Sequence, residues 1–368
     1  MLKMEKKMID YPLLYITLLL SLIGVVMIFS ASYYYAYYQF HDSYHFLKKQ
    51  VIGLVLGLIV MYITSQIDYR VWKKFAVMLY IIAAISLVAV LIPGIGKLVN
   101  NARRWIDIGP IQFQPSELAK YALVITLSTY FDHVEKPKSR FKAFIISMLL
   151  TGLFFVLIYK EPNMSTCILI LGISMLMLFA WGLNLGYFVT MGALAVPVLY
   201  YLTTKEQYRV ERIQALFNPW ADPTDKGYQI IQSLYAIGSG GLFGIGLGQS
   251  RQKLLYIPEP HTDFIFSILC EELGFVGAIF VIVLFVLFVW RGIVIALNSP
   301  DRFGTLLAFG VTSIIALQAI LNIAVVTASV PATGVPLPFI TYGGTSIVFH
   351  LFGVGILLSI SRRIKVIK

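Results

Sequence analysis

The sequence predicts an all-α membrane protein with ten transmembrane helices and a long structured extracytoplasmic loop between the seventh and eighth. Of its 368 residues, 58% are hydrophobic and only 13% are charged, whereas soluble domains average roughly 25% charged residues. The mean hydropathy is +0.81. The apolar residues form long runs, about the 20 residues that cross a bilayer core as a helix. A membrane β-barrel would show short alternating segments instead.

Ten apolar segments follow one another as candidate transmembrane helices. They cover residues 11–32, 47–64, 74–92, 116–132, 142–160, 164–182, 186–203, 263–290, 303–328 and 340–360. We therefore expect one integral membrane domain over residues 1–368, with 204–262 as its large loop. The first segment is too long for a signal peptide and lacks a clear cleavage site, so we expect it to be retained.

The distribution of basic residues orients the predicted helices. Ten helices place both termini on one side, and the segments on that side hold 16 of the 29 Lys and Arg residues. The other side holds 13, but six of these lie in the long segment 204–262, which the positive-inside rule discounts. Both termini are therefore predicted to be cytoplasmic. The same bias accounts for the net charge of +11 without a nucleic-acid partner.

Three of the predicted outer segments are long enough to carry function. Residues 93–115 join the third and fourth helices, residues 204–262 form the longest connection, and residues 329–342 hold three prolines. The predicted topology places all three on the same face. Structured loops on a rigid scaffold are where binding and catalytic residues concentrate, so we expect the functional site at this face.

Three carboxylates lie at the start of the eighth predicted helix, in "HTDFIFSILCEELGF". Ionisable groups in membrane helices cost about 3 kcal/mol and usually face a polar cavity. Asp263 and Glu271, eight residues apart, would share one helix face. We interpret Asp263, which follows His261, as a general base at the cavity mouth. A helix cap at Asp263 is the alternative. For Glu271 and Glu272, an ion pair with a neighbouring helix explains the charge as well as a direct role does.

A second polar cluster lies in "NARRWIDIGPIQFQPSELAK". Arg103 and Arg104 are adjacent guanidinium groups, which suit phosphate through their planar fork. Trp105 suits a sugar ring or the membrane interface, and an ordinary interfacial belt explains these residues equally well. Glu117 and Lys120 are spaced to pair within one helix. Because a lysine in a membrane helix needs a partner or water, we expect the pair to face the same cavity.

The remaining motifs predict turns and packing. "KEPNMST", residues 160–166, is typical of a tight turn, although its charges leave a direct role open. The glycine string in 238–248 could cradle phosphate, but we favour close packing or a re-entrant segment. "YGGTS", residues 342–346, favours close helix packing. The two cysteines have no metal-type spacing, and no nucleotide-binding motif is present, so we predict outer-face chemistry without ATP.

The long motifs of this chain resemble the SEDS family (shape, elongation, division and sporulation), and within it the FtsW branch. The resemblance rests on "ARRWI" with "GPIQFQPSELAK", "GYQIIQSLYAIGSGG", "QKLLYIPEPHTDFIF" and "PATGVPLPFITYGGTS", and runs through nearly the whole chain. It implies a peptidoglycan glycosyltransferase that polymerises lipid II at the outer face of the bacterial cytoplasmic membrane. It also implies a class B penicillin-binding protein as transpeptidase partner and contacts with other divisome membrane proteins.

The resemblance assigns roles to residues already singled out. Asp263 matches the essential aspartate of the family, and Arg104 with Trp105 matches positions thought to line the same cavity. The family commonly has aspartate where this chain has Asn163, which puts a charged role there in doubt. We expect the substrate-binding residues to be Arg103, Arg104, Trp105, Glu117, Lys120, His261, Glu271 and Glu272.

These expectations combine into one mechanism. Asp263 would take the proton of an acceptor GlcNAc 4-hydroxyl that attacks the donor MurNAc C1 with inversion, while Arg103, Arg104 and Lys120 stabilise the leaving pyrophosphate. A divalent cation, Mg²⁺ or Mn²⁺, could share that task, although the sequence shows no dedicated site. A lipid II flippase and a non-catalytic divisome scaffold are the alternatives. The sequence does not separate a role in division from one in sporulation.

Overall fold

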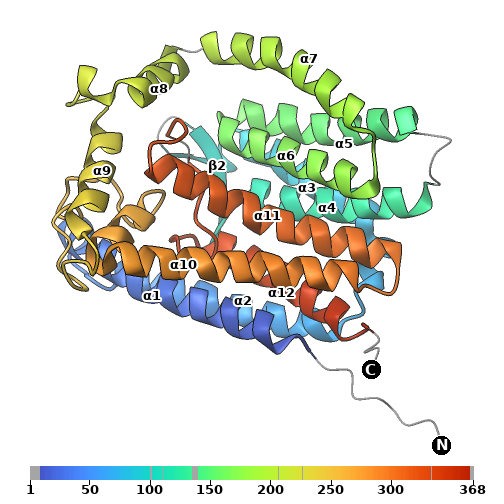
Figure 1. The fold of residues 1–368 in the computed structure, drawn as a ribbon, viewed down its shortest axis with the longest axis horizontal. Coiled ribbons are helices and arrows are strands. Elements are labelled where there is room, and N and C mark those ends of the chain that lie inside the picture. The colour runs from blue at the N-terminus through green and yellow to red at the C-terminus, as the bar shows by residue number, and fades with distance from the viewer. Residues whose placement is uncertain are drawn as a thin grey trace, which may run out of the picture.

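The computed structural model describes residues 9–99, 102–109, 111–134, 140–205, 207–225, 227–332 and 334–364. Each of the ten predicted segments forms a helix, and the helices run side by side along the longest axis (Figure 1). They are α1 (Tyr11–Phe40), α2 (His45–Gln66), α3 (Arg70–Leu91), α4 (Pro115–His133), α5 (Arg140–Lys160), α6 (Met164–Trp181), α7 (Leu185–Thr204), α10 (Ile265–Leu297), α11 (Arg302–Val326) and α12 (Gly344–Ser361).

Among the described residues, 8 of these helices are long and apolar enough to cross a membrane, and α4 is not one of them. Helix α4 can be less apolar because of its position in the bundle. It packs against α3, α5, α6, α11 and α12, and most of its side chains are buried. A helix enclosed by other helices does not need an apolar lipid-facing surface, so it can carry Glu117 and Lys120.

Ion pairs tie the helices together at one end of the bundle. The start of α1 and the end of α12 meet there, because the backbone N–H of Asp10 donates to Ser361 Oγ at 3.2 Å. This confirms that both ends of the helical bundle lie on one side. The other pairs at this end join Arg291 to Asp10, Arg70 to Asp301, Lys73 to Asp132 and Arg363 to Asp68. Lys3, Lys6, Lys7, Lys136, Lys138, Lys365 and Lys368, which the charge comparison also used, lie outside the described residues.

The three predicted outer segments meet at the opposite end (Figure 1). Residues 93–115 fold into an antiparallel sheet of order β1-β2-β3, and the loop after α7 contains two short helices and a 3₁₀ turn. Arg212 Nη1 donates to the carbonyl of Ala332 at 2.9 Å, and the backbone N–H of Tyr342 donates to that of His261 at 3.0 Å. The elements are β1 (Gly96–Val99), β2 (Ala102–Ile108), β3 (Ile111–Phe113), α8 (Gln207–Phe217), η1 (Pro219–Ala221) and α9 (Tyr228–Gly240).

Several helix boundaries differ from the prediction. α1 continues to Phe40, because its last turns consist mostly of tyrosines, which are amphipathic and suit a membrane interface. α10 begins at Ile265, so Asp263 lies in the turn before the helix. The prediction that Asp263 and Glu271 share a helix face is therefore wrong. The cap interpretation is wrong as well, because Phe264 occupies the N-cap position and no side chain caps the helix.

The helix α10 is broken at Gly274, and the glycine-rich loop enters the break. Gly274 has φ 68° and ψ −169°. The backbone N–H groups of Phe275 and Val276 donate to loop carbonyls of Gly241 and Leu242 at 2.9 and 3.1 Å. In return, the carbonyls of Glu271 and Glu272 accept from the N–H groups of Ile245 and Gly246 at 3.0 and 3.1 Å. The loop thus satisfies both sides of two interrupted helical hydrogen bonds.

Glycine is required where this loop touches α10. A Cβ at Gly244 would lie 2.1 Å from the carbonyl oxygen of Glu272, and one at Gly274 would lie 2.2 Å from the backbone nitrogen of Gly244. These contacts confirm the prediction of close packing for the glycine string. The loop is not enclosed by protein, however, since the side chains of Leu242 and Phe243 are 64% and 80% exposed.

Close packing also explains the "YGGTS" stretch. A Cβ at Gly53 of α2 would lie 3.1 Å from the Cα of Gly344, at the start of α12. One turn further along α2, a Cβ at Gly57 would lie 2.5 Å from a methyl group of Leu351. Small residues thus let α2 and α12 approach closely, as the sequence predicted.

Candidate active site

The backbone around Asp263 is held in place by α11 and by the segment before α12. Asn322 Nδ2 donates to the carbonyl of Asp263 and to that of Val335, both at 2.9 Å. Thr341 Oγ1 donates to the carbonyl of Thr262 at 3.4 Å. Because Asn322 is 1% exposed, its amide is a fixed support, and the turn that carries Asp263 is positioned from two directions.

The carboxylate of Asp263 is partly exposed, and no described residue donates a hydrogen bond to it. Gly334 lies beside it, since a Cβ at Gly334 would lie 3.4 Å from Oδ2. Burial raises the pKa of Asp263 to about 7, and Glu259 adds to the rise, while Arg104 and Arg212 oppose it. A carboxyl group with this pKa can take up and release a proton near neutral pH, as a general base must.

A β-bulge places Arg104 next to the site. Strand β1 pairs Lys97 with Trp105 and Leu98 with Arg103, which leaves Arg104 as the extra residue of β2. Bulges of this kind re-aim a side chain and are common beside active sites. Arg103 and Trp105 are partly exposed on the same strand. Of the three predicted residues, Arg104 is the one that acts electrostatically on Asp263.

Arg104 also holds the turn between α5 and α6. Its Nε donates to the carbonyl of Glu161 at 3.2 Å and its Nη2 donates to that of Pro162. The Glu161 side chain is 0% exposed, and neither of its carboxyl oxygens has a partner among the described residues. Burial raises the pKa of Glu161 to about 8, against the effect of Arg104. Asn163 caps α6 by accepting from the N–H of Thr166 at 3.3 Å, so its amide does the capping that aspartate would do.

Glu271 and Glu272 anchor the outer loop to α10. Glu272 Oε1 lies 2.8 Å from Lys253 Nζ, and its carboxylate accepts from Ser30 Oγ at 2.6 Å, so it links α10 to α1. Glu271 accepts from the hydroxyl of Ser250 and from the N–H of Arg251, the latter at 3.0 Å. Both glutamates are 1% exposed. Glu272 therefore forms an ion pair, but its partner is a loop residue and not the neighbouring helix that the sequence interpretation named.

Glu117 and Lys120 form the predicted pair inside α4. Lys120 Nζ lies 2.7 Å from Glu117 Oε1, and both side chains are buried. The next residue, Tyr121, joins α4 to α12, since its hydroxyl lies 3.1 Å from Nδ1 of His350. Nε2 of His350 lies 3.0 Å from Ser346 Oγ. The pair therefore belongs to a buried polar layer between α4 and α12.

His261 is enclosed by aromatic rings. Its ring centroid lies 4.0 Å from that of Phe46, 5.4 Å from that of Tyr35 and 5.5 Å from that of Tyr342. Burial lowers the pKa of His261 to about 3. A neutral imidazole in this position supports the turn that holds Asp263.

Comparison with known proteins identifies the family of this chain. A family model described as cell cycle protein, of the FtsW, RodA and SpoVE type, matches residues 11–366. The chain belongs to this family. It is the SEDS family that the sequence motifs resemble.

Relatives and solved structures match this chain along nearly their full lengths. The chain is 43% identical to stage V sporulation protein E of Bacillus subtilis over 96% of its length and 97% of that protein. It is 42% identical to a "probable peptidoglycan glycosyltransferase FtsW" of Geobacter sp. over 97% of both chains. A solved peptidoglycan synthase complex, described as coordinating polymerization and crosslinking, contains a chain that matches with a TM-score of 0.81 and 29% identity, over 96% of this chain and 98% of that one. RodA of Thermus thermophilus matches with a TM-score of 0.72 and 27% identity, over 97% of both chains.

Four residues of this SEDS site were missed by sequence reasoning. Arg212 and Glu259 act on Asp263 from the large loop, where charged residues are common and give no signal. Asn322 could have been found, because a polar amide inside an otherwise apolar segment marks a polar contact. Glu161 could also have been noticed, because an acidic residue at the end of an apolar segment is unusual. A tight turn explained its position equally well.

The described residues contain no group of three or more His, Cys, Asp or Glu side chains that could hold a metal ion. Mg²⁺ and Mn²⁺ prefer oxygen ligands, often shared with substrate phosphates. A divalent cation at this SEDS site would therefore take most of its ligands from the substrate and from water.

Proposed function

We propose that this protein is a peptidoglycan glycosyltransferase that polymerises lipid II into glycan strands at the outer face of the cytoplasmic membrane, in division or sporulation. The observation that carries the proposal is the Asp263 carboxyl group, which has a pKa of about 7 and lies where three outer segments meet. The relatives named peptidoglycan glycosyltransferase and the synthase complex with the same fold support it.

In the proposed reaction, ionised Asp263 accepts the proton of the acceptor's GlcNAc 4-hydroxyl. The freed oxygen attacks C1 of the donor MurNAc, the new O4–C1 bond forms, and the bond from C1 to the undecaprenyl pyrophosphate breaks on the opposite face. The anomeric centre inverts and pyrophosphate leaves with the electron pair. A general base of this kind contributes about 10²–10⁴-fold to the rate.

Arg104 and Arg103 would stabilise the charge that develops on the leaving pyrophosphate. Arg104 already lies close enough to oppose the raised pKa of Asp263, and its planar guanidinium can bind two phosphate oxygens at once. Lys120 is held inside α4 by Glu117, so we assign it to the support of this helix. A divalent cation, if bound, would add positive charge at the same leaving group.

The partner and the orientation follow from the same proposal. We expect a class B penicillin-binding protein to supply the cross-linking activity, because the solved complex with this fold couples polymerization to crosslinking. Further divisome membrane proteins are expected to bind as well. The end of the bundle with Asp10 and Ser361 would face the cytoplasm, in agreement with the basic residues of the flanking segments.

The deciding experiment is polymerisation of labelled lipid II by purified protein, alone and with its class B partner, read on a gel that separates glycan chains by length. Asp263→Ala and the isosteric Asp263→Asn are expected to abolish polymer. Asp42→Ala removes another outer carboxylate, paired with Lys48, and is expected to keep it. Polymer from Asp263→Asn at the wild-type rate would exclude the base. No polymer from wild type with its partner would favour the flippase or scaffold.

A further inference from the structure

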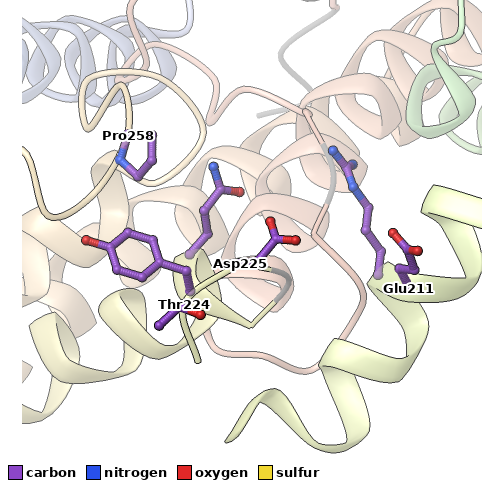
Figure 2. Close-up of a pocket in the computed structure, with 7 residues that line it drawn as sticks. Glu211, Thr224, Asp225 and Pro258 are labelled. Carbon is purple, nitrogen blue, oxygen red and sulfur yellow. The ribbon is translucent and has the colours of Figure 1, made fainter. Parts of the chain in front are cut away.

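A polar cleft of about 440 Å³ lies in the large outer loop, and Arg212 is the one residue that it shares with the site around Asp263. Its size falls within the range of about 300–1,000 Å³ that is usual for ligand sites. Figure 2 shows Glu211 on one wall and Pro258 on the opposite one, with Thr224 and Asp225 between them. The polar and aromatic residues of the lining are Glu211, Arg212, Thr224, Asp225, Tyr228 and Gln229.

The cleft adjoins the Asp263 site. Arg212 lines the cleft and also acts electrostatically on Asp263. Pro258 lines the opposite wall, and Glu259, the next residue, acts on Asp263 as well. Arg212 is fixed to the segment before α12 by its hydrogen bond to the carbonyl of Ala332 at 2.9 Å. A substrate held at Asp263 can therefore extend into the cleft without leaving the outer face.

The side chains in the cleft suit a saccharide. The carboxylates of Glu211 and Asp225 accept hydrogen bonds from sugar hydroxyls, and the amide of Gln229 both donates and accepts. The half-buried ring of Tyr228 offers a flat apolar face next to a polar hydroxyl. Two carboxylates against one guanidinium disfavour a phosphate group there. These features separate the cleft from the cationic surroundings expected at the pyrophosphate.

We propose that this cleft binds the saccharide of the growing glycan strand next to the reacting sugar. The inference rests on the proposed function, because a strand reaches the cleft only if the chain handles glycan at Asp263. A site that holds the strand between successive couplings lets the enzyme add many disaccharides before release. Loss of the cleft is therefore expected to shorten the product.

The first test measures binding directly, without any reaction. The probe is the soluble β-1,4-linked tetrasaccharide (GlcNAc–MurNAc)₂, which carries no lipid and no pyrophosphate, titrated by calorimetry into the purified full chain. Tyr228→Ala and Gln229→Ala are expected to weaken binding by about tenfold or more, while Tyr228→Phe keeps the ring and retains it. Tyr235→Ala and Gln232→Ala are matched controls, because both residues lie on α9 outside the cleft. No binding by wild type, or equal loss in the controls, would overturn the inference.

The second test measures product length with labelled lipid II. Tyr228→Ala and Gln229→Ala are expected to shorten the chains by about threefold or more, a larger effect than on lipid II consumption. Wild-type polymer with unchanged length in both variants would overturn the cleft assignment and leave the proposed function intact. If wild type makes no polymer, the proposed function fails, and tetrasaccharide binding alone decides the cleft. Variants that lose the class B partner but still bind the tetrasaccharide would show a protein interface instead.

Discussion

Arg104 donates a hydrogen bond to the backbone carbonyl of Glu161, 57 residues further along the chain. The same guanidinium opposes the raised pKa of Glu161 and that of Asp263. One cation therefore acts on two carboxyl groups. Burial raises the pKa of Glu161 to about 8 and that of Asp263 to about 7. Both groups therefore titrate near neutral pH, and the ionised form of Asp263 is the one that the proposed mechanism requires.

The pH dependence of polymerisation is expected to follow Asp263. Because the base must be ionised, the rate should rise as pH increases through about 7, the pKa of Asp263. Glu259 raises this pKa and Arg212 lowers it. Glu259→Gln is therefore expected to move the rising limb to lower pH, and Arg212→Gln to higher pH, each by about one unit.

The measurement is the initial rate of lipid II consumption between pH 5.5 and 9, normalised to each variant's own maximum. Lys97→Gln is the matched control, because Lys97 lies on the outer face but pairs with Asp107 at 3.1 Å. If the rising limb of the pH–rate profile stays at the same pH in both Glu259→Gln and Arg212→Gln, Asp263 is not the group that titrates.

Glu161 is expected to make stability fall with rising pH. Its folded-state pKa of about 8 lies above the ordinary value of 4.5, so between these values only the folded chain keeps the proton. The free energy of unfolding should therefore decrease by about 1.4 kcal/mol per pH unit across this window and level off above it. Glu161→Gln cannot ionise and should lack this decrease.

Thermal unfolding of wild type and Glu161→Gln in detergent at pH 5, 6.5 and 8 checks the prediction. The wild type should lose stability relative to the variant at each step. Asp107→Asn, which changes an exposed carboxylate, serves as the control. Parallel curves for wild type and Glu161→Gln would show that Glu161 is ionised throughout.

The long helices could be predicted from sequence because most of them are long apolar runs, and the pair Glu117–Lys120 followed from helical spacing. The location of the site could be predicted from sequence, but the arrangement of its side chains could not. The bulge at Arg104 depends on pairing between two strands, and the break in α10 depends on a loop 30 residues away in sequence (Gly244 to Gly274). Such features arise from tertiary contacts, which leave no periodic pattern along the chain.

Substitutions at three glycines can separate the stability cost of a steric clash from the cost of an unfavourable backbone conformation. Gly244 and Gly248 share φ +79°, but only at Gly244 would a Cβ meet the backbone, 2.1 Å from the carbonyl of Glu272. Gly248→Ala is expected to cost about 1–2 kcal/mol from its left-handed conformation alone. Gly244→Ala should cost clearly more and detach the loop from α10. Gly238→Ala, in α9 with open space around it, should be neutral or stabilising.

Melting temperatures of the three purified variants test this order. The same preparations can be probed by hydrogen exchange at Phe275 and Val276, whose N–H groups donate to the loop. Exchange should accelerate in Gly244→Ala and stay near wild type in Gly248→Ala. Equal melting temperatures for these two variants would mean that the loop does not depend on close contact at Gly244.

The buried pair of Lys253 and Glu272 is expected to matter far more than an exposed pair. Their side chains are 5% and 0% exposed, so Lys253→Met leaves a buried charge and should cost about 3–5 kcal/mol. Adding Glu272→Gln should restore part of this stability. Lys48 and Asp42 form the exposed counterpart, at 65% and 35% exposure, and Lys48→Met should cost about 0–1 kcal/mol.

Unfolding of the single and double variants in detergent gives the coupling between the two charges. A double variant that is no more stable than Lys253→Met would show that Glu272 does not depend on Lys253 for its neutralisation. Similar losses for Lys253→Met and Lys48→Met would show that the buried pair is solvated in the folded protein.

The break at Gly274 makes the glycine-rich loop a structural part of α10. The segment of α10 before Gly274 is hydrogen-bonded to Ile245 and Gly246 of this loop, and the segment after it is hydrogen-bonded to Gly241 and Leu242. The loop thus bridges the two segments of α10 across the break. The turn with Asp263 directly precedes the first of these segments, so the glycine-rich loop also contributes to the support of the carboxylate.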